Sequence, residues 1–126
     1  MRSALVAGAV LILAALPLLF RHHENARERE VRVIVAAIAS GDLAPVETAF
    51  EPSSYASERA RFFAPGARSL VTSRGSVQRV EARGSGTGCA RGDRAFVAVF
   101  ERGELRACVR YAPDHRIERF ALEASR

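Results

Sequence analysis

The chain has 126 residues and a formal net charge of +5, and all of its basic side chains other than histidine are arginine. This length allows one domain plus a short targeting segment, and apolar and charged fractions of 48% and 26% exclude a disordered chain. The arginines alternate with acids, as in the run 79–83, which argues against a nucleic-acid-binding protein because such proteins carry a concentrated basic stripe. Two explanations of the arginine excess stay open: GC-rich codon usage, and a surface that meets phosphate or anionic lipid.

An uncharged apolar run extends from Ser3 to Phe20. As a helix it would span about 27 Å, the short end of what crosses a hydrocarbon core. A cleaved signal peptide has a similar run, but signal peptidase requires small residues just before the cut, and this run ends in bulky Leu18-Leu19-Phe20. We therefore expect residues 1–20 to be an uncleaved single-pass membrane anchor, with a cleaved signal as the alternative.

The sequence contains conflicting signals for the orientation of this anchor in the membrane. Arg2 precedes the run and Arg21, Arg27 and Arg29 follow it, a distribution that taken alone keeps the domain in the cytoplasm. The very short N-terminal tail and a pair of cysteines in the domain favour the opposite orientation. We expect the C-terminal domain to be extracytoplasmic, in the periplasm or at the cell surface.

A charged run at residues 21–30 is expected to form a helical stalk, and residues 31–126 the folded domain. Glu28 and Arg32 have the i, i+4 spacing of a helix-stabilising ion pair. His22 and His23 are consecutive, so a helix would point them about 100° apart and they could not bind one metal together.

Apolar residues at helical spacing predict the first helix of the domain. The members of this stripe are Val31, Ile34, Val35 and Ile38. Gly41 is expected to end the helix, and Asp42 to cap a second short helix whose buried edge is Leu43, Val46 and Phe50. Ser53 or Ser54 is expected to cap a third helix at 55–63, and a short fourth helix is expected at 67–73.

Four apolar or alternating runs predict an antiparallel meander. They are Val77–Arg83, Arg94–Glu101, Glu104–Tyr111 and a last strand anchored by Ile117, Phe120 and Leu122. In the third run Leu105, Ala107, Val109 and Tyr111 face the core, and Arg106, Cys108 and Arg110 face the other side. Because only this sheet can cover the stripe on the first helix, the predicted fold class is α+β, with helices packed on a four-stranded antiparallel meander.

The helix end at Ser40-Gly41-Asp42 and the short helix closing on Phe50-Glu51-Pro52 resemble members of the nuclear-transport-factor-two-like superfamily. The resemblance extends from Arg27 to Leu122, with residues 75–82 opening the sheet and 114–117 beginning the last strand. It implies a cystatin-like roll and the role of a small membrane-anchored bacterial accessory domain. The catalytic Asp/His or Tyr/Asp sets of the isomerase and dehydratase branches map onto no position here, so the resemblance implies no catalytic residue.

Two short motifs lie between the first two predicted strands. The glycine-rich run 84–88 precedes a strand, whereas a phosphate-cradling loop leads into a helix, so we interpret the run as a bulge or mobile loop. Arg91-Gly92-Asp93 matches the integrin-adhesion tripeptide, and a hairpin turn is the simpler interpretation.

Cys89 and Cys108 are the only cysteines. In an exported domain two cysteines predict a disulfide, whereas in a cytoplasmic domain they would be two inert half-buried thiols. If both hairpins are tight, the strand at 94–101 separates the two residues by nearly 10 Å, beyond the roughly 7 Å limit for a disulfide. The bond therefore requires the glycine-rich loop to lay Cys89 over the face that carries Cys108.

The functional expectation is a non-enzymatic, membrane-anchored domain that binds a protein partner or a small ligand, without a cofactor or metal. A structural subunit of a membrane complex, or of a homo-oligomer, is the first alternative. An isomerase- or hydrolase-type enzyme is the second, although His115 and Asp93 fall in predicted turns instead of in a pocket. Arg106 and Arg110 form the candidate partner face for an acidic partner, with an ordinary solvated face as its alternative.

Overall fold

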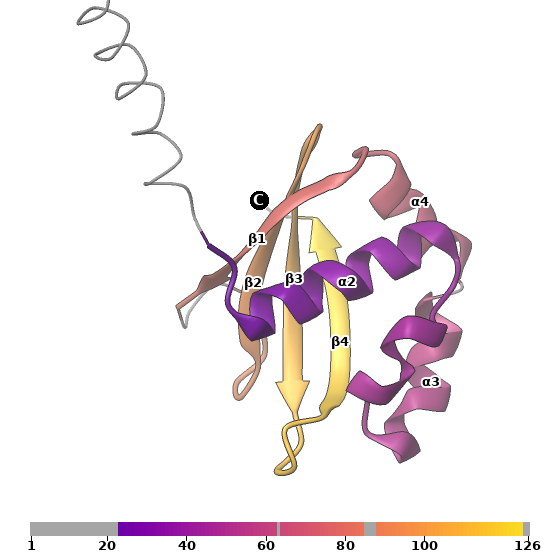
Figure 1. The fold of residues 1–126 in the computed structure, drawn as a ribbon, viewed down its shortest axis with the longest axis vertical. Helices are drawn as coiled ribbons and strands as arrows, with labels where there is room; N and C mark the ends of the chain where they lie inside the picture. The colour runs from indigo at the N-terminus through magenta and orange to yellow at the C-terminus, as the bar shows by residue number, and fades with distance from the viewer. Residues whose placement is uncertain (1–22, 63, 85–87, 125–126) are drawn as a thin grey trace, which may run out of the picture.

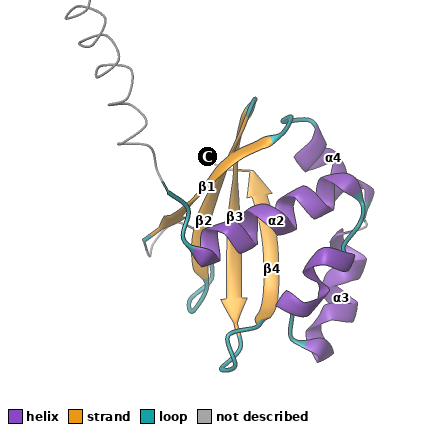
Figure 2. Cartoon of the chain, viewed as in Figure 1, coloured by secondary structure: helices purple, strands orange, loops and turns teal. Residues whose placement is uncertain are grey.

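The computed structural model describes residues 23–62, 64–84 and 88–124. Within these ranges four helical segments precede four strands (Figures 1 and 2). The helical segments are α2 (Ala26–Ser40), η1 (Ala44–Ala49), α3 (Pro52–Phe62) and α4 (Pro65–Thr72). The strands are β1 (Val77–Arg83), β2 (Arg94–Phe100), β3 (Gly103–Tyr111) and β4 (Ile117–Ala124). The predicted α+β class is confirmed.

The strands form one antiparallel sheet in the order β1-β2-β3-β4, which confirms the predicted meander. Helix α2 crosses one face of this sheet, α3 lies beside β4, and α4 packs against α2 (Figure 1). The opposite face carries no helix in the described part of the chain. We call the face under α2 the inner face and the opposite one the outer face.

The apolar stripe of α2 is the centre of the core, as its spacing predicts. Its four residues Val31, Ile34, Val35 and Ile38 are at most 1% exposed, and Leu43, Val46 and Phe50 of the next segment are also buried. The ring of Phe62 on α3 lies 5.6 Å from both Phe50 and Phe120, in edge-on contacts that join the helices to β4.

The helix starts differ from the predicted ones. Asn25 caps α2 in a reciprocal capping box with Glu28, so the helix begins at Ala26 and residues 26–30 of the expected stalk belong to the packed domain. Arg32 pairs with Glu24 at 2.8 Å, and the expected pair of Arg32 with Glu28 stays a prediction. Gly41 ends α2 with a φ of 81°, as predicted.

The second and third helical segments require two further corrections. The second, η1, is a 3-10 helix whose N-cap is Leu43, although Asp42 still accepts the backbone N–H of Ala44 at 3.1 Å. Helix α3 begins at Pro52, so Ser53 and Ser54 lie inside its first turn and neither caps it. The carboxylate of Glu51 accepts the backbone N–H groups of both serines, because an anion before a helix start meets its unpaired donors and the positive end of its dipole.

Two buried glutamates attach the helices to the two edge strands. Glu28 of α2 accepts the backbone N–H of Ala82 in β1 at 2.6 Å, and Glu58 of α3 accepts the N–H of Phe120 in β4 at 3.4 Å. Arg61 donates to the carbonyl of Phe120 at 2.9 Å. One residue on each edge strand thus has its outward backbone groups bound internally, which reduces the number of groups with which another strand could pair.

Glu58 makes the stability of the domain depend on pH. Burial raises the pKa of its carboxyl, although Arg61 and the N–H of Phe120 act in the opposite direction. The folded state therefore holds this proton more tightly than the unfolded state, and the contribution of Glu58 to stability falls as the pH rises above the unfolded value. When the pH rises from about 4 to about 7, we expect the free energy of unfolding of the wild type to fall relative to that of the Glu58→Gln variant.

Urea unfolding of both proteins at the two pH values measures this change. Glu118→Gln is the matched control, because Glu118 lies on β4 and is exposed. A difference between wild type and Glu58→Gln that stays constant, or that moves in the other direction, contradicts the prediction.

The helices of the described residues include none that is both long and apolar enough to cross a membrane. The predicted anchor at residues 1–20 lies outside the described residues, as do residues 21 and 22 of the expected stalk and Phe63 of the third predicted helix.

Candidate functional site: a disulfide-braced turn and an arginine-lined hollow

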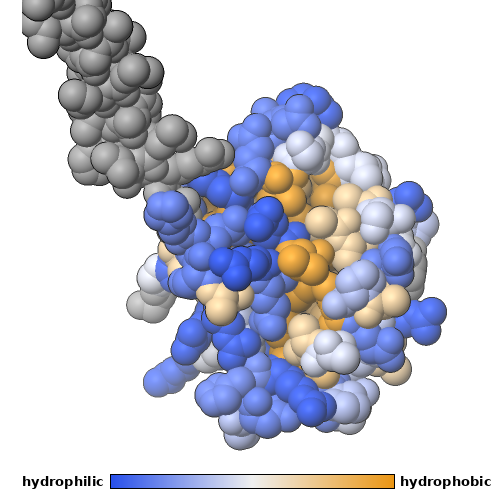
Figure 3. Space-filling model, in the orientation of Figure 1, coloured by the Kyte–Doolittle hydropathy of each residue, from blue (hydrophilic) through white to orange (hydrophobic). Residues whose placement is uncertain are grey.

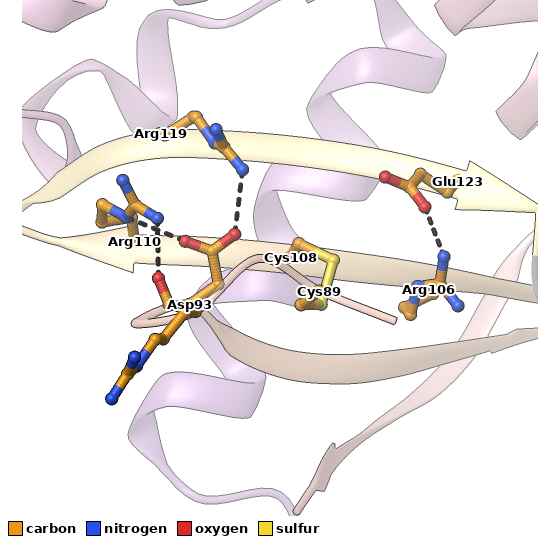
Figure 4. Close-up of a disulfide and its surroundings, with 8 residues drawn as sticks. Cys89, Asp93, Arg106, Cys108, Arg110, Arg119 and Glu123 are labelled. Carbon is orange, nitrogen blue, oxygen red and sulfur yellow. Dashed lines mark hydrogen bonds and ion pairs between the residues drawn. A yellow bond between two sulfur atoms is a disulfide. The ribbon is translucent and has the colours of Figure 1, made fainter. Parts of the chain in front are cut away.

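A disulfide joins Cys89, in the segment before β2, to Cys108 in β3, with 5.4 Å between the Cα atoms (Figure 4). Cys108 lies on the outer face, directly across from Ala95 of β2. Cys89 reaches it by lying over the sheet and not within a strand. The predicted disulfide is confirmed, while residues 85–87 of the loop expected to permit it lie outside the described residues.

Asp93 attaches the other end of the segment that begins at Cys89 to the sheet. Its carboxylate accepts the Nε–H of Arg110 in β3 and an Nη2–H of Arg119 in β4, both at 2.9 Å, and its side chain is fully buried (Figure 4). Between the two attachments the chain turns, with the N–H of Asp93 donating to the carbonyl of Ala90 at 3.0 Å and Gly92 adopting a φ of 90°. We call residues 89–93 the braced turn.

The candidate partner face predicted at Arg106 and Arg110 lies beneath this segment. Arg106 forms an ion pair with Glu123 and lies against Gly88, and its side chain is 20% exposed. Arg110 binds Asp93 and also the carbonyl of Arg91 at 3.0 Å. Both arginines therefore bind groups of their own chain, and their contact with an acidic partner stays a prediction.

A hollow of about 550 Å³ lies on the other side of the braced turn, where β1 ends and β2 begins, beside the start of α2. Four arginines line it: Arg27 of α2, Arg83 of β1, Arg91 of the braced turn and Arg94 of β2. We call it the arginine hollow. At the start of α2, the backbone N–H groups of Asn25 and Glu28 are already bound in the capping box. The four guanidinium groups, more than the start of the helix, therefore determine which ligands the arginine hollow can bind.

Acids of the chain neutralise only part of this charge. Arg27 pairs with Glu30 at 3.2 Å, and Arg83 pairs with Glu81 at 2.9 Å. Arg91 and Arg94 have no ion pair within the described residues. Asp93, the one acid among the described lining residues, already binds two arginines of the outer face. The arginine hollow is thus a positively charged concavity.

The ring of Tyr111 lies close to the guanidinium groups of two of these arginines. The guanidinium of Arg27 lies 3.9 Å from the centre of the Tyr111 ring, and that of Arg94 lies 5.7 Å from it. Burial, together with the negative charge of Glu30, raises the pKa of Tyr111 to about 12. The phenol therefore stays neutral at physiological pH, and its ring holds Arg27 and Arg94 toward the same side of the sheet.

An apolar groove lies at the opposite end of α2. It is lined by Val33, Ala36 and Ala39 of α2 together with Val71, Val77 and Phe100. Val33 is 43% exposed, and apolar atoms gather on this face of the molecule in Figure 3. The hollow and the groove therefore differ in chemistry: the first suits an anion and the second an apolar group.

Sequence reasoning found the cysteines but not the groups that surround them. The sequence places Asp93 in a turn and Tyr111 on the core side of its strand, but it assigns neither them nor Arg27, Arg94 and Arg119 to a site. One signal was available for Arg119: aligning the last two strands places it directly opposite Arg110, and two facing arginines need an acid between them. No three His, Cys, Asp or Glu side chains of the described chain lie close enough to hold a metal ion.

Comparisons of the chain with models of protein families, with curated proteins and with solved structures give no match.

Proposed function

We propose that the protein is a membrane-anchored, extracytoplasmic, non-enzymatic binding domain with the cystatin-like roll of the nuclear-transport-factor-two-like superfamily. The observation that carries the proposal is the braced turn. One disulfide and one buried carboxylate fix a segment that would otherwise be a free hairpin loop, and this segment forms a wall of the arginine hollow. Rigid walls reduce the entropy lost when a ligand binds.

The extracytoplasmic location rests on the same bond. Disulfides persist in oxidising compartments and are rare in the cytosol, where thiols are kept reduced. The apolar run at residues 3–20 supplies a means of attachment. The short N-terminal tail and the cysteine pair favour the orientation with the N-terminus inside and the domain outside, against the arginine count.

We propose a binding role in preference to a catalytic one because the buried acids already have partners within the chain. Glu28 and Glu58 hold edge strands, and Asp93 is enclosed by two guanidinium groups. His115 lies exposed in the turn before β4. Glu28, Glu58 and His115 do not line the arginine hollow. Asp93 does, but its carboxylate is buried against Arg110 and Arg119, whereas four cations line the hollow.

Protease access combined with gel mobility tests this proposal on the full chain expressed in a bacterium. In spheroplasts we expect added protease to digest the domain while a cytosolic marker stays intact. Without reductant the wild type should migrate faster than it does after reduction, and a Cys89→Ala/Cys108→Ala variant should show no such difference. A domain protected in spheroplasts, with its cysteines reduced in cells, would refute the extracytoplasmic assignment.

A further inference from the structure

We propose that the arginine hollow binds a phosphate group, held by the exposed Arg91 and Arg94 and by Arg27, which lies against the Tyr111 ring. The proposal deepens the proposed function by naming a ligand class. The four arginines come from α2, β1, the braced turn and β2, and they line one concavity. Guanidinium groups bind phosphate oxygens through paired, charge-assisted hydrogen bonds.

These arginines are only partly neutralised by acids of the described residues. Arg91 and Arg94 have no ion pair among the described residues. The guanidinium of Arg27 pairs with Glu30, donates to the carbonyl of His115 at 3.0 Å and lies against the Tyr111 ring. Cations gathered without equal counter-charge repel one another, and an anion between them relieves this repulsion. A phosphate offers more acceptor oxygens than a carboxylate, so it can serve arginines from several directions.

Arg91 lies in a segment that is fixed on both sides. The chain is covalently held two residues before it, at Cys89, and ion-paired two residues after it, at Asp93. The hollow volume of about 550 Å³ also falls within the roughly 300–1,000 Å³ of small-molecule sites. The hollow can therefore take a phosphate together with part of the group that carries it.

Two sources present this chemistry: a free phosphate compound, and the headgroup of an anionic phospholipid such as phosphatidylglycerol, whose phosphate, unlike that of phosphatidylcholine, has no attached ammonium group to neutralise it. The second gains support from the predicted anchor. Arg27 follows Phe20 by seven residues, and seven residues reach at most about 25 Å even when fully extended. If residues 1–20 lie in the membrane, the hollow is therefore held near the lipid headgroups.

The test uses the full chain in nanodiscs of neutral phosphatidylcholine, with thermal unfolding of the domain as the readout. A ligand that binds only the folded state raises the midpoint, and the rise grows with the logarithm of the ligand concentration once that concentration exceeds the Kd. At constant ionic strength, inorganic phosphate should raise the midpoint of the wild type, and acetate should raise it much less. An equal response to both anions, or no response to phosphate, overturns the proposal.

Two matched double variants locate the effect. Arg91→Gln/Arg94→Gln should weaken the apparent affinity for inorganic phosphate at least about tenfold, because two charge-assisted contacts are lost. Arg68→Gln/Arg102→Gln removes the same charge from exposed positions on α4 and in the β2–β3 turn, and should change the affinity less than about twofold. Equal weakening in both variants would show general charge attraction and would refute the site. Should the first variant fail to fold, Arg91→Gln alone tests the same contact.

Nanodiscs containing phosphatidylglycerol distinguish the two sources. If the headgroup fills the hollow, the wild-type midpoint is already raised in these discs and added phosphate raises it little further, whereas Arg91→Gln/Arg94→Gln loses the difference between disc types. If the ligand is a free phosphate compound, phosphate acts equally in both discs. Failure of the proposed function is detected separately: a chain that does not enter discs lacks the anchor, and its phosphate response is then measured in solution.

Discussion

Replacing Cys89 and Cys108 together by alanine is expected to lower the free energy of unfolding by about 3 kcal/mol. The bond joins residues 19 apart in sequence and thereby restricts the unfolded chain. Alanine is the appropriate replacement because Cys108 is 2% exposed, and a serine hydroxyl would be buried there without an assured partner. Urea unfolding of the variant and the wild type measures the loss.

Reduction of the wild type provides the control for this prediction. A reductant should lower the wild-type stability toward that of the alanine variant and should leave the variant unchanged. The disulfide-free proteins should also unfold with a slightly steeper dependence on urea, because their unfolded chains expose more surface. A loss below about 1 kcal/mol would mean that the ion pairs of Asp93 restrain the braced turn without help from the bond.

Local patterns in the sequence predicted the elements of this fold well. The stripe from Val31 to Ile38 is buried on the sheet, and β1 begins at Val77 and ends at Arg83 as its apolar run indicates. These signals are local because helical and strand periodicities decide which side chains share a face. The requirement that Cys89 leave the sheet followed from strand spacing alone, and the structure meets it.

Interactions across long separations in sequence could not be predicted in the same way. Glu28 lies in a charged run that resembles a solvated stalk, yet it is buried because it accepts an N–H from Ala82, 54 residues away. Glu58 likewise accepts the backbone N–H of Phe120, which is 62 residues away in the sequence. A carboxylate gives no local indication of which distant donor it will meet, so burial of these acids became evident only from the assembled fold.

The arginine hollow illustrates the same limit for the candidate site. Arg27, Arg83 and Arg94 are separated by long stretches of chain, and their alternation with acids argued against any concentrated basic surface. The fold gathers them because α2 begins beside the end of β1 and the start of β2. Net charge and spacing describe the chain, whereas a binding surface depends on which elements end at the same place.

The second large effect is expected at Asp93, where Asp93→Asn should lower the free energy of unfolding by about 2 kcal/mol. Arg110 and Arg119 face each other directly across β3 and β4, and the Asp93 carboxylate lies between them. Asparagine keeps the size of the side chain but removes its charge, which leaves two facing cations and a buried side chain without its ion pairs. The expected loss is below the usual cost of breaking a buried pair, because the two arginines are 36% and 42% exposed.

Asp114→Asn is the matched control for this substitution. Asp114 pairs with Arg116 at 3.6 Å, and both side chains are about half exposed, so its loss should change stability by less than about 0.5 kcal/mol. A second comparison isolates repulsion between the arginines. Adding Arg119→Gln to Asp93→Asn should recover part of the lost stability, whereas Arg119→Gln in the wild type should be destabilising because it removes a partner of the buried carboxylate. If Arg119→Gln is equally destabilising in both backgrounds, Asp93 does not act by neutralising the two arginines, and the braced turn depends on the disulfide alone.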